Sequence, residues 1–401
     1  MGDRVLVLGA GLQGRAVVED LVKRSGVDEV IVADARPEAL KWPWPASDVT
    51  RVTAVHLDAA DHNAVAKLAA CGLSCIVNML PKRFEAIAAG AALEAGCHLV
   101  STNYGQALEA LNDRATERGV TIMPESGLDP GIDFVMAARA ISMFDELDTL
   151  ISYGTGIPAP ECRDSSPIQY KVSWTLAGVL GAYRRPGRVL IDGEERELSP
   201  DEIFQPRWTH EVVHPDCGPL EAYVNGDAVR CARLFGILGS VRNTARFSLR
   251  WPGHCAFWSR VGGLGLLDDT PLAGTDMSPR EFLRRWLEPR LQYADDERDM
   301  IILRLDVAGR RGGSRKARRW EVVDYRDMTT GLMAMNRTVG YPASIVAQMI
   351  MRGEVTHRGV CSPARDVPPE PFLAALEERG ISVTEEEVDP DDCPWPPSPG
   401  V

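Results

Sequence analysis

The chain has 401 residues, of which 45% are hydrophobic and 25% charged, and a formal net charge of −13 at pH 7. This composition is typical of a globular protein and excludes fibrous and disordered classes, while the length exceeds what one hydrophobic core usually supports, so we expect two domains. The acidic balance argues against nucleic acid as a partner, and the absence of a signal peptide or of an apolar run of roughly 18 residues predicts no membrane association.

The first part of the chain, from Arg4 to about Pro124, alternates short apolar runs with helical patterns. The runs expected to form strands are Val5–Leu8, Val30–Ala33, Val52–Leu57, Cys75–Asn78 and His98–Ser101. Such alternation indicates repeated strand–helix–strand units, in which each helix returns the chain so that the next strand runs parallel to the last. We therefore predict an α/β fold with a Rossmann-like, doubly wound parallel sheet over residues 1–126.

Strand patterns predominate after a helix expected from Asp133 to about Phe144. The clearest are Leu147–Tyr153, Val189–Ile191, Arg246–Trp251 and Ile301–Val307. This change predicts a second, mainly antiparallel α+β domain over residues 127–339. The basic run from 310 to 319 is expected at the exposed tip of a hairpin, because alternating strand patterns flank it.

The end of the chain contains a helical pattern and a polar segment. Pro342 opens an apolar helical stretch through Met351, and residues 340–385 are expected to rejoin the first domain. Acids and prolines without apolar periodicity follow, so we predict a disordered tail over residues 386–401.

A glycine-rich turn joins the first predicted strand to the helix after it. Its sequence is Gly9-Ala10-Gly11-Leu12-Gln13-Gly14. The first glycine allows the tight turn, the second lets the backbone approach a pyrophosphate, and the third lets helix and strand pack closely. The backbone N–H groups and the dipole at the helix start favour phosphate, so the turn predicts a dinucleotide site.

Two side chains after the second predicted strand bear on the choice of cofactor. Asp34 lies 20 residues after Gly14, where an acid accepts hydrogen bonds from the adenine-ribose hydroxyls. Its charge repels a 2′-phosphate and favours NAD, whereas Arg36 is placed to accept one. We expect NAD as the cofactor and keep NADP as the alternative.

Further cofactor contacts are expected at the carboxyl ends of the third and fourth strands, where open α/β sheets bind ligands. Asp58 is predicted to border the adenine, although an exposed turn acid is nearly as good an interpretation. The segment expected to approach the nicotinamide is Asn78-Met79-Leu80-Pro81.

Three motifs of the middle region carry a family resemblance in combination with the glycine turn. They are Gly127-Leu128-Asp129-Pro130-Gly131-Ile132-Asp133, Tyr153-Gly154-Thr155-Gly156-Ile157-Pro158-Ala159-Pro160-Glu161 and Tyr170-Lys171-Val172-Ser173-Trp174. With them the chain resembles the saccharopine dehydrogenase-like family over nearly its whole length. Only the tail lies outside the resemblance.

The resemblance implies a Rossmann domain with an inserted α+β substrate and dimerisation domain, a homodimer, and NAD(P)-linked oxidation or reduction at a CH–NH bond. The substrate is then an amino acid, an amine or an aldehyde. The glutamate-forming saccharopine type is the leading expectation, and lysine 6-dehydrogenase or a carboxynorspermidine-type enzyme is the alternative. A non-catalytic dinucleotide-binding module is a third possibility from a different class.

One position departs from the family pattern. In saccharopine-type members an arginine suited to a substrate carboxylate usually precedes the glycine that follows the Tyr-Lys-Xaa-Ser-Trp motif. Here Ala177 precedes Gly178. The sequence therefore leaves the substrate open.

The chemistry at a carbon–nitrogen bond needs alignment of the reacting carbon and control of one amine proton, since the cofactor performs the redox step. Asp129 is a catalytic candidate, because a carboxylate at the cleft holds a cationic amine or takes a proton; a helix cap formed with Pro130 is the competing interpretation. Lys171 is the second candidate, against a lysine that points to solvent. The residues expected to contact substrate are Thr102, Asn103, Tyr104, Gly127, Leu128, Pro130, Gly131, Tyr170 and Trp174.

Metal binding is not expected. The seven histidines show no HExxH spacing, and the nine cysteines contain no Cys-Xaa-Xaa-Cys pair. The cysteines are better explained as reduced thiols of a cytoplasmic protein.

Overall fold

The computed structural model describes residues 2–40 and 49–393. Contacts divide it into two compact units, and each consists of two chain segments. The first unit comprises residues 1–138 and 336–382, and the second comprises 139–335 and 383–401. The boundary after 138 lies later than the sequence suggested, and the returning segment begins at 336 rather than 340.

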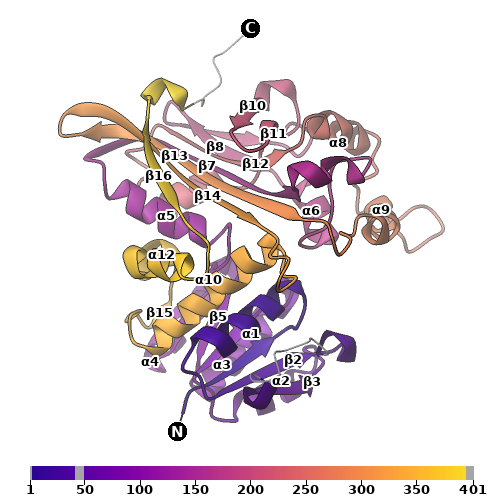
Figure 1. The fold of residues 1–401 in the computed structure, drawn as a ribbon, viewed down its shortest axis with the longest axis vertical. Coiled ribbons are helices and arrows are strands. Elements are labelled where there is room, and N and C mark those ends of the chain that lie inside the picture. The colour runs from indigo at the N-terminus through magenta and orange to yellow at the C-terminus, as the bar shows by residue number, and fades with distance from the viewer. Residues whose placement is uncertain (1, 41–48, 394–401) are drawn as a thin grey trace. The chain divides into compact units, whose positions relative to one another are not determined.

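The first unit contains a parallel sheet, as the alternation of strands and helices predicted (Figure 1). Among the described residues it has seven strands in the order β15-β6-β5-β4-β1-β2-β3. The strands are β1 (Arg4–Leu8), β2 (Glu29–Asp34), β3 (Val52–His56), β4 (Cys75–Asn78), β5 (His98–Ser101), β6 (Thr121–Met123) and β15 (Gly359–Val360). The β1 strand is fully buried between β2 and β4, so the glycine turn that follows it emerges at the centre of the sheet.

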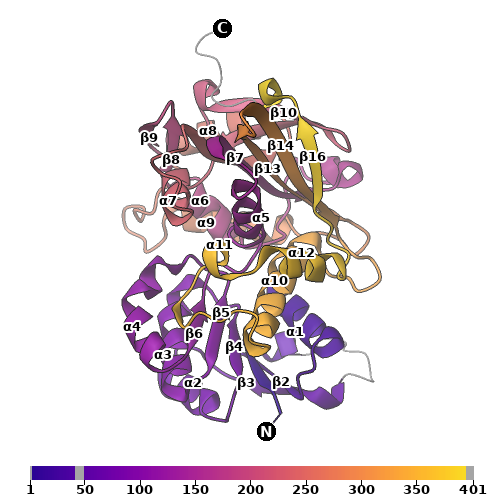
Figure 2. The same cartoon turned by 90° about the vertical axis from the view of Figure 1, so that its left-hand side faces the viewer.

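Helices cover both faces of this sheet. They are α1 (Leu12–Arg24), α2 (His62–Ala69), α3 (Glu85–Ala95), α4 (Asn112–Glu117), α5 (Ile132–Ile141), α10 (Ala334–Met351), α11 (Pro363–Asp366) and α12 (Pro369–Glu377). The apolar residues of α2, α3 and α4 form one core cluster with the sheet. The α10 helix packs against α1 (Figures 1 and 2), and a Cβ atom at Gly340 would lie 2.6 Å from the Cβ of Ala16.

Buried polar contacts connect the two segments of the first unit. Asp20 in α1 accepts hydrogen bonds from the Arg379 guanidinium at 2.7 and 3.0 Å, and both side chains are at most 4% exposed. The hydroxyl of Tyr341 donates to Glu19 at 2.9 Å. Because a buried charge without its partner is costly, these contacts fix the position of the returning segment on α1.

The second unit contains a larger mixed sheet. The part of the chain that the structure describes gives it nine strands, with the main order β10-β11-β12-β7-β13-β14-β16 and with β8 and β9 attached beside β12. They are β7 (Glu146–Pro158), β8 (Gly187–Ile191), β9 (Glu194–Leu198), β10 (Thr209–His214), β11 (Gly218–Val224), β12 (Asn243–Arg250), β13 (Asp299–Arg311), β14 (Ser314–Tyr325) and β16 (Thr384–Val388). The pairing is antiparallel except between β12 and β7, which confirms the predicted α+β character, and β13 and β14 form the predicted hairpin.

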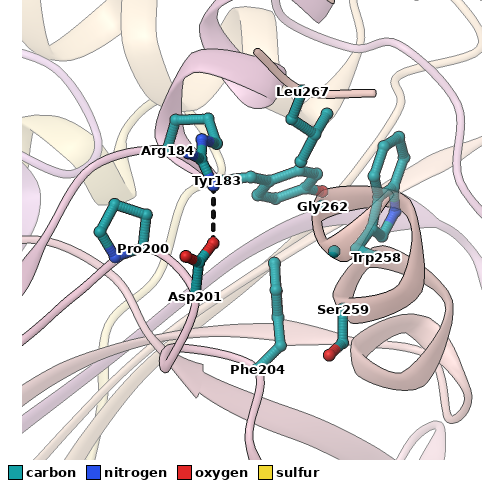
Figure 3. A pocket seen from close by; sticks show the side chains of 10 residues that line it. Tyr183, Arg184, Pro200, Asp201, Phe204, Trp258, Ser259, Gly262 and Leu267 are labelled. Atoms are coloured by element: carbon teal, nitrogen blue, oxygen red, sulfur yellow. Dashed lines mark hydrogen bonds and ion pairs between the residues drawn. The ribbon is translucent and has the colours of Figure 1, made fainter. Parts of the chain in front are cut away.

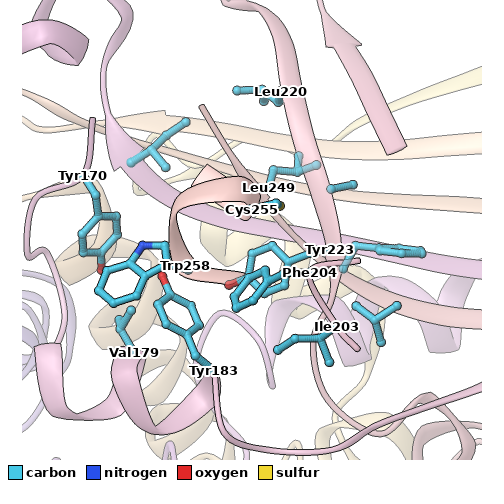
Figure 4. Packing of buried hydrophobic residues seen from close by; sticks show 14 of the residues in the cluster. Tyr170, Val179, Tyr183, Ile203, Phe204, Leu220, Tyr223, Leu249, Cys255 and Trp258 are labelled. Carbon is cyan, nitrogen blue, oxygen red and sulfur yellow. The ribbon is translucent and has the colours of Figure 1, made fainter. Parts of the chain in front are cut away.

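Four helices of this unit are α6 (Leu176–Ala182), α7 (Ala228–Leu234), α8 (His254–Gly263) and α9 (Pro279–Leu287). An aromatic-rich core joins them to the sheet (Figure 4). Tyr183 of the chain just after α6 packs 4.9 Å from Trp258 of α8 between ring centroids. Buried aromatic pairs of this kind add about 0.5–1.5 kcal/mol each beyond the area that they bury.

Two predictions about the end of the chain are wrong. The helix expected to open at Pro342 begins at Ala334, and Pro342 lies inside it. The expected disordered tail over 386–401 contains most of β16, which pairs with β14 from Ala317↔Val388 to Glu321↔Thr384. Residues 394–401 of that tail lie outside the described residues.

Candidate functional site

The glycine turn has the geometry that a bound dinucleotide requires. Gly9 adopts a φ of 97°, which L side chains rarely adopt. A Cβ atom at Gly14 would lie 1.9 Å from the carbonyl oxygen of Gly9, so only glycine allows this approach of α1 to the strand end. Gly11 is the N-cap residue of α1, and none of the described side chains caps that helix end. The turn therefore fits a pyrophosphate that binds to backbone N–H groups.

Asp34 lies at the end of β2 and is tied to the glycine turn. Its carboxylate accepts a hydrogen bond from the backbone N–H of Ala10 at 2.8 Å and another from that of Arg36 at 2.8 Å. The side chain is only 9% exposed. Each oxygen thus has a backbone donor already, and each retains a second lone pair that a ribose hydroxyl can use.

Two arginines surround this carboxylate. The Arg36 guanidinium lies 3.5 Å from Asp34 and is 63% exposed. Burial, followed by the positive charge of Arg36, lowers the pKa of Arg15 in α1, and Asp34 opposes this shift. The guanidinium groups therefore lie close enough to repel each other. Two positive charges beside one negative charge give this end of the turn a net positive charge.

The segment after β4 lies beside the glycine turn, as the sequence predicted for a cofactor contact. A Cβ atom at Gly9 would approach the Leu80 side chain at 3.1 Å and the Met79 carbonyl oxygen at 3.2 Å. Asn78 is fully buried, while Pro81 is exposed. By contrast, Asp58 is exposed and its carboxylate accepts the N–H of Ala60 at 2.9 Å, which is the geometry of a turn acid.

A buried carboxylate that the sequence did not single out connects the ends of β4 and β5. Glu85, the first residue of α3, is 3% exposed. It accepts hydrogen bonds from Asn78 at 2.8 Å, from Asn103 at 2.7 Å and from the Ser101 hydroxyl. Asn103, a predicted substrate contact, is thereby held to the segment after β4. An acid at the start of an alanine-rich helix was the one available signal.

The loop around Asp129 adjoins the end of β5. A Cβ atom at Gly127 would lie 3.4 Å from the Thr102 side chain, and one at Gly131 would collide with the Gly127 backbone at 2.0 Å. The Asp129–Pro130 peptide bond is cis, Leu128 is buried, and Asp129 is half-buried. The structure thus brings the predicted substrate residues 102 and 127–131 together in the first unit.

Asp133 lies directly behind this loop. Its carboxylate accepts the N–H of Gly131 at 2.8 Å. Burial, opposed by backbone hydrogen bonds and aided by the charge of Glu125, raises the pKa of Asp133 to about 8. The sequence predicted Asp133 only as a helix start, because nothing in the local pattern shows its complete burial.

The third motif lies in the second unit and differs from both interpretations of its sequence. Lys171 is 7% exposed, and its ammonium group donates to both oxygens of Glu297 at 2.6 and 2.5 Å. Tyr170 is buried, and burial raises its pKa to about 12. Trp174 is 42% exposed and lies over Gly178. Lys171 therefore neither points to solvent nor carries an uncompensated charge.

A cavity of about 170 Å³ lies between α6, α8 and the segment before β10 (Figure 3). Tyr183, Phe204 and Trp258 line it, and an ion pair of 2.8 Å between Arg184 and Asp201 lies beside them. None of the predicted site residues contributes to this cavity, so we assign it no part in the chemistry.

Two further observations bear on partners. Possible metal ligand atoms of His357, Cys361 and Asp366 lie within 4.8 Å of one another, and His357 Nδ1 is 2.9 Å from Asp366. Arg358 and Arg365 adjoin this group, and the expectation of no metal stays a prediction. Across residues 2–40 and 49–393, no helix combines the length and apolarity needed to cross a membrane.

Comparison with known families gives matches over both units. Residues 5–123 match the saccharopine dehydrogenase NADP binding domain, and residues 127–381 match the saccharopine dehydrogenase C-terminal domain. The first match supports a nicotinamide dinucleotide as the cofactor. It favours NADP, against the preference for NAD drawn from Asp34.

Individual relatives agree with these matches. The chain is 26% identical to the mitochondrial alpha-aminoadipic semialdehyde synthase of Bos taurus, covering 95% of this chain but 47% of that protein. It thus spans about half the length of that relative. The saccharopine dehydrogenase [NADP(+), L-glutamate-forming] of Saccharomyces cerevisiae is 25% identical over 97% of this chain and 100% of its own. A solved apo structure of the yeast L-Glu forming enzyme shares the fold, with a TM-score of 0.83 at 24% identity over 97% of this chain and 100% of that chain.

Proposed function

We propose, since the chain belongs to the saccharopine dehydrogenase family, that it is an NADP(H)-dependent oxidoreductase acting on the CH–NH bond of an amino-acid secondary amine. The observation that carries this proposal is the glycine turn, where a side chain at Gly14 would collide with the backbone of Gly9, within a chain matched by the family over both units. Saccharopine of the glutamate-forming type is the first candidate substrate.

The reaction class sets what the protein must do. The bound dinucleotide accepts a hydride from the carbon beside nitrogen, and the amine proton leaves to a base, so the C–N bond becomes an iminium bond. Water adds to the iminium carbon, and the C–N bond then breaks to give an amine and an aldehyde. The side chains are needed to hold the substrate and to move the amine proton.

The charges near Asp34 support NADP(H) over NAD(H). Arg15 and Arg36 surround a single carboxylate whose oxygens are occupied by backbone donors. Charge-assisted hydrogen bonds from guanidinium groups to phosphate are the strong ones in proteins. We assign the adenosine 2′-phosphate to Arg36, with Arg15 behind it.

For the proton transfer we propose Asp129, which is half-buried and lies in the same loop cluster as Thr102 and Tyr104. Lys171 is less suited to this role, because Glu297 already compensates its charge. We assign Lys171 instead to positioning the motif that contains Tyr170 and Trp174. A homodimer and a cytoplasmic location complete the proposal, on the sequence resemblance alone.

The test is a coupled screen that follows the absorbance of reduced nicotinamide. Saccharopine, lysine and carboxyl-bearing polyamines are offered with NADP⁺ or NAD⁺, and glutamate with amino-acid semialdehydes is offered with NADPH or NADH. We expect turnover with NADP(H) and a secondary amine that joins two amino-acid skeletons. No turnover across the panel would refute the enzyme and leave a dinucleotide-binding module.

A variant separates catalysis from binding. Asp129→Asn should abolish turnover while the dissociation constant for NADP⁺ stays within about twofold, because the amide keeps the shape but cannot take the proton. Asp58→Asn is the matched control, since its exposed turn acid should not affect the rate. Equal rates for both variants would remove Asp129 from the mechanism.

A further inference from the structure

Glu85 is a buried anion without a counter-ion. Among the described residues, no lysine, arginine or histidine nitrogen lies within 4.0 Å of its carboxylate, although it is only 3% exposed. Lys82 is the cation close enough to influence it electrostatically. A buried charge of this kind costs several kcal/mol unless other groups stabilise it.

The groups around Glu85 favour its ionised form. Asn78 and Asn103 donate amide N–H groups to one carboxylate oxygen, and the Ser101 hydroxyl donates to the other. Amide nitrogens have no lone pair to offer, so a protonated Glu85 would lose at least one of these bonds. Burial raises the pKa of Glu85, and the three hydrogen bonds oppose that rise. The start of α3 adds the favourable end of a helix dipole.

The position of this anion explains what it acts on. It lies at the carboxyl ends of β4 and β5, the edge at which parallel sheets bind their ligands. Through Asn78, which also accepts the N–H of Leu80 at 3.2 Å, it fixes the segment beside the glycine turn. Through Asn103, which also donates to the Leu80 carbonyl oxygen at 3.2 Å, it fixes the segment after β5.

We propose that Glu85 is a positioning residue of the cofactor site whose negative charge favours the oxidised dinucleotide over the reduced one. The nicotinamide ring is cationic when oxidised and neutral when reduced, so an unpaired anion at this edge stabilises only the oxidised form. The inference rests on the proposed cofactor, but it does not require that any substrate be known.

The experiment measures dissociation constants of NADP⁺ and NADPH, without substrate, by tryptophan fluorescence and calorimetry. Glu85→Gln keeps the shape and removes the charge; its amide can still accept from the asparagines and donate to Ser101. We expect its NADP⁺ dissociation constant to rise about tenfold, or about 1.4 kcal/mol, with NADPH affected less than twofold. Glu94→Gln removes an exposed charge from the same helix and should change neither value.

Other outcomes are equally informative. Equal weakening of both forms in Glu85→Gln, or no change in either, would overturn the electrostatic role. If Glu85→Gln does not fold, the wild-type protein still decides, because it must bind NADP⁺ more tightly than NADPH. Failure of the wild-type protein to bind either form would refute the proposed cofactor itself.

Discussion

Arg36 carries most of the solvent-accessible positive charge at the end of β2, and its removal is the direct test of cofactor choice. We expect Arg36→Ala to raise the dissociation constant for NADP⁺ about tenfold, because it loses a charge-assisted contact with phosphate. The constant for NAD⁺ should stay within twofold. Arg118→Ala, an exposed arginine elsewhere in the first unit, serves as the control. Equal loss for both cofactors would contradict the assignment.

His214 gives the second unit a pH-dependent stability. Burial alone would lower its pKa, but hydrogen bonds and charge from Cys217 and Glu321 outweigh this and raise it to about 9; Glu321 lies 3.3 Å away. The folded pKa exceeds the unfolded value of about 6.5, so the stabilisation is full below that value and disappears as the pH rises through 9. Urea unfolding of wild type and His214→Asn should differ by about 1–3 kcal/mol at pH 6 and converge above pH 9.

The control for this prediction is His62→Asn, which replaces an exposed histidine at the start of α2. It should leave the unfolding free energy nearly unchanged at both pH values. A difference between wild type and His214→Asn that does not depend on pH would mean that His214 acts through packing and not through charge.

At single residues, the sequence could predict the glycines but not the environment of charged groups. Gly9, Gly11 and Gly14 follow from one local motif, because the turn needs only neighbouring residues. The contact between Lys171 and Glu297 spans 126 positions, and the burial of Glu85 depends on two other strands. No local pattern reports such distant partners, so the structure was needed to correct Lys171 and to find Glu85.

The junction between β1 and α1 depends on the absence of one methyl group. Gly14→Ala should abolish measurable dinucleotide binding and lower stability, because the new Cβ atom would lie 1.9 Å from the Gly9 carbonyl oxygen. Gly90→Ala in α3 is the matched control, since no atom lies within 4 Å of its Cβ position. Alanine there should stabilise the helix by about 0.5–1 kcal/mol. Calorimetric melting and a titration with NADP⁺ check both variants.

At the level of elements, local patterns predicted the strands of the first unit well and the end of the chain poorly. Its central strands are buried on both faces and read as continuous apolar runs. By contrast, β16 consists of Thr384, three glutamates and Val388, and its side chains are mostly exposed. Its acids pair with basic residues of β14, among them Lys316 and Arg318. An edge strand held by charge pairs and backbone bonds has no apolar periodicity to detect.

For the whole molecule, β16 makes the end of the chain a structural part of the second unit. A protein ending at residue 382 should melt roughly 5 °C lower and aggregate, because the edge of β14 loses its backbone partners. A protein ending at residue 393 keeps β16 and is the control. Scanning calorimetry with light scattering compares the two, and identical melting would show that β16 contributes nothing to stability.

The discontinuous units also constrain synthesis of the protein. Residues 1–138 emerge from the ribosome first, but α10 and β15, which complete their sheet and cover α1, come only after residue 335. At about 5–20 residues per second the wait is roughly ten to forty seconds. During this interval one apolar face of the nascent sheet has no cover of its own. The first unit therefore completes its fold only when translation of the second is almost over, which makes it a natural client of ribosome-associated chaperones.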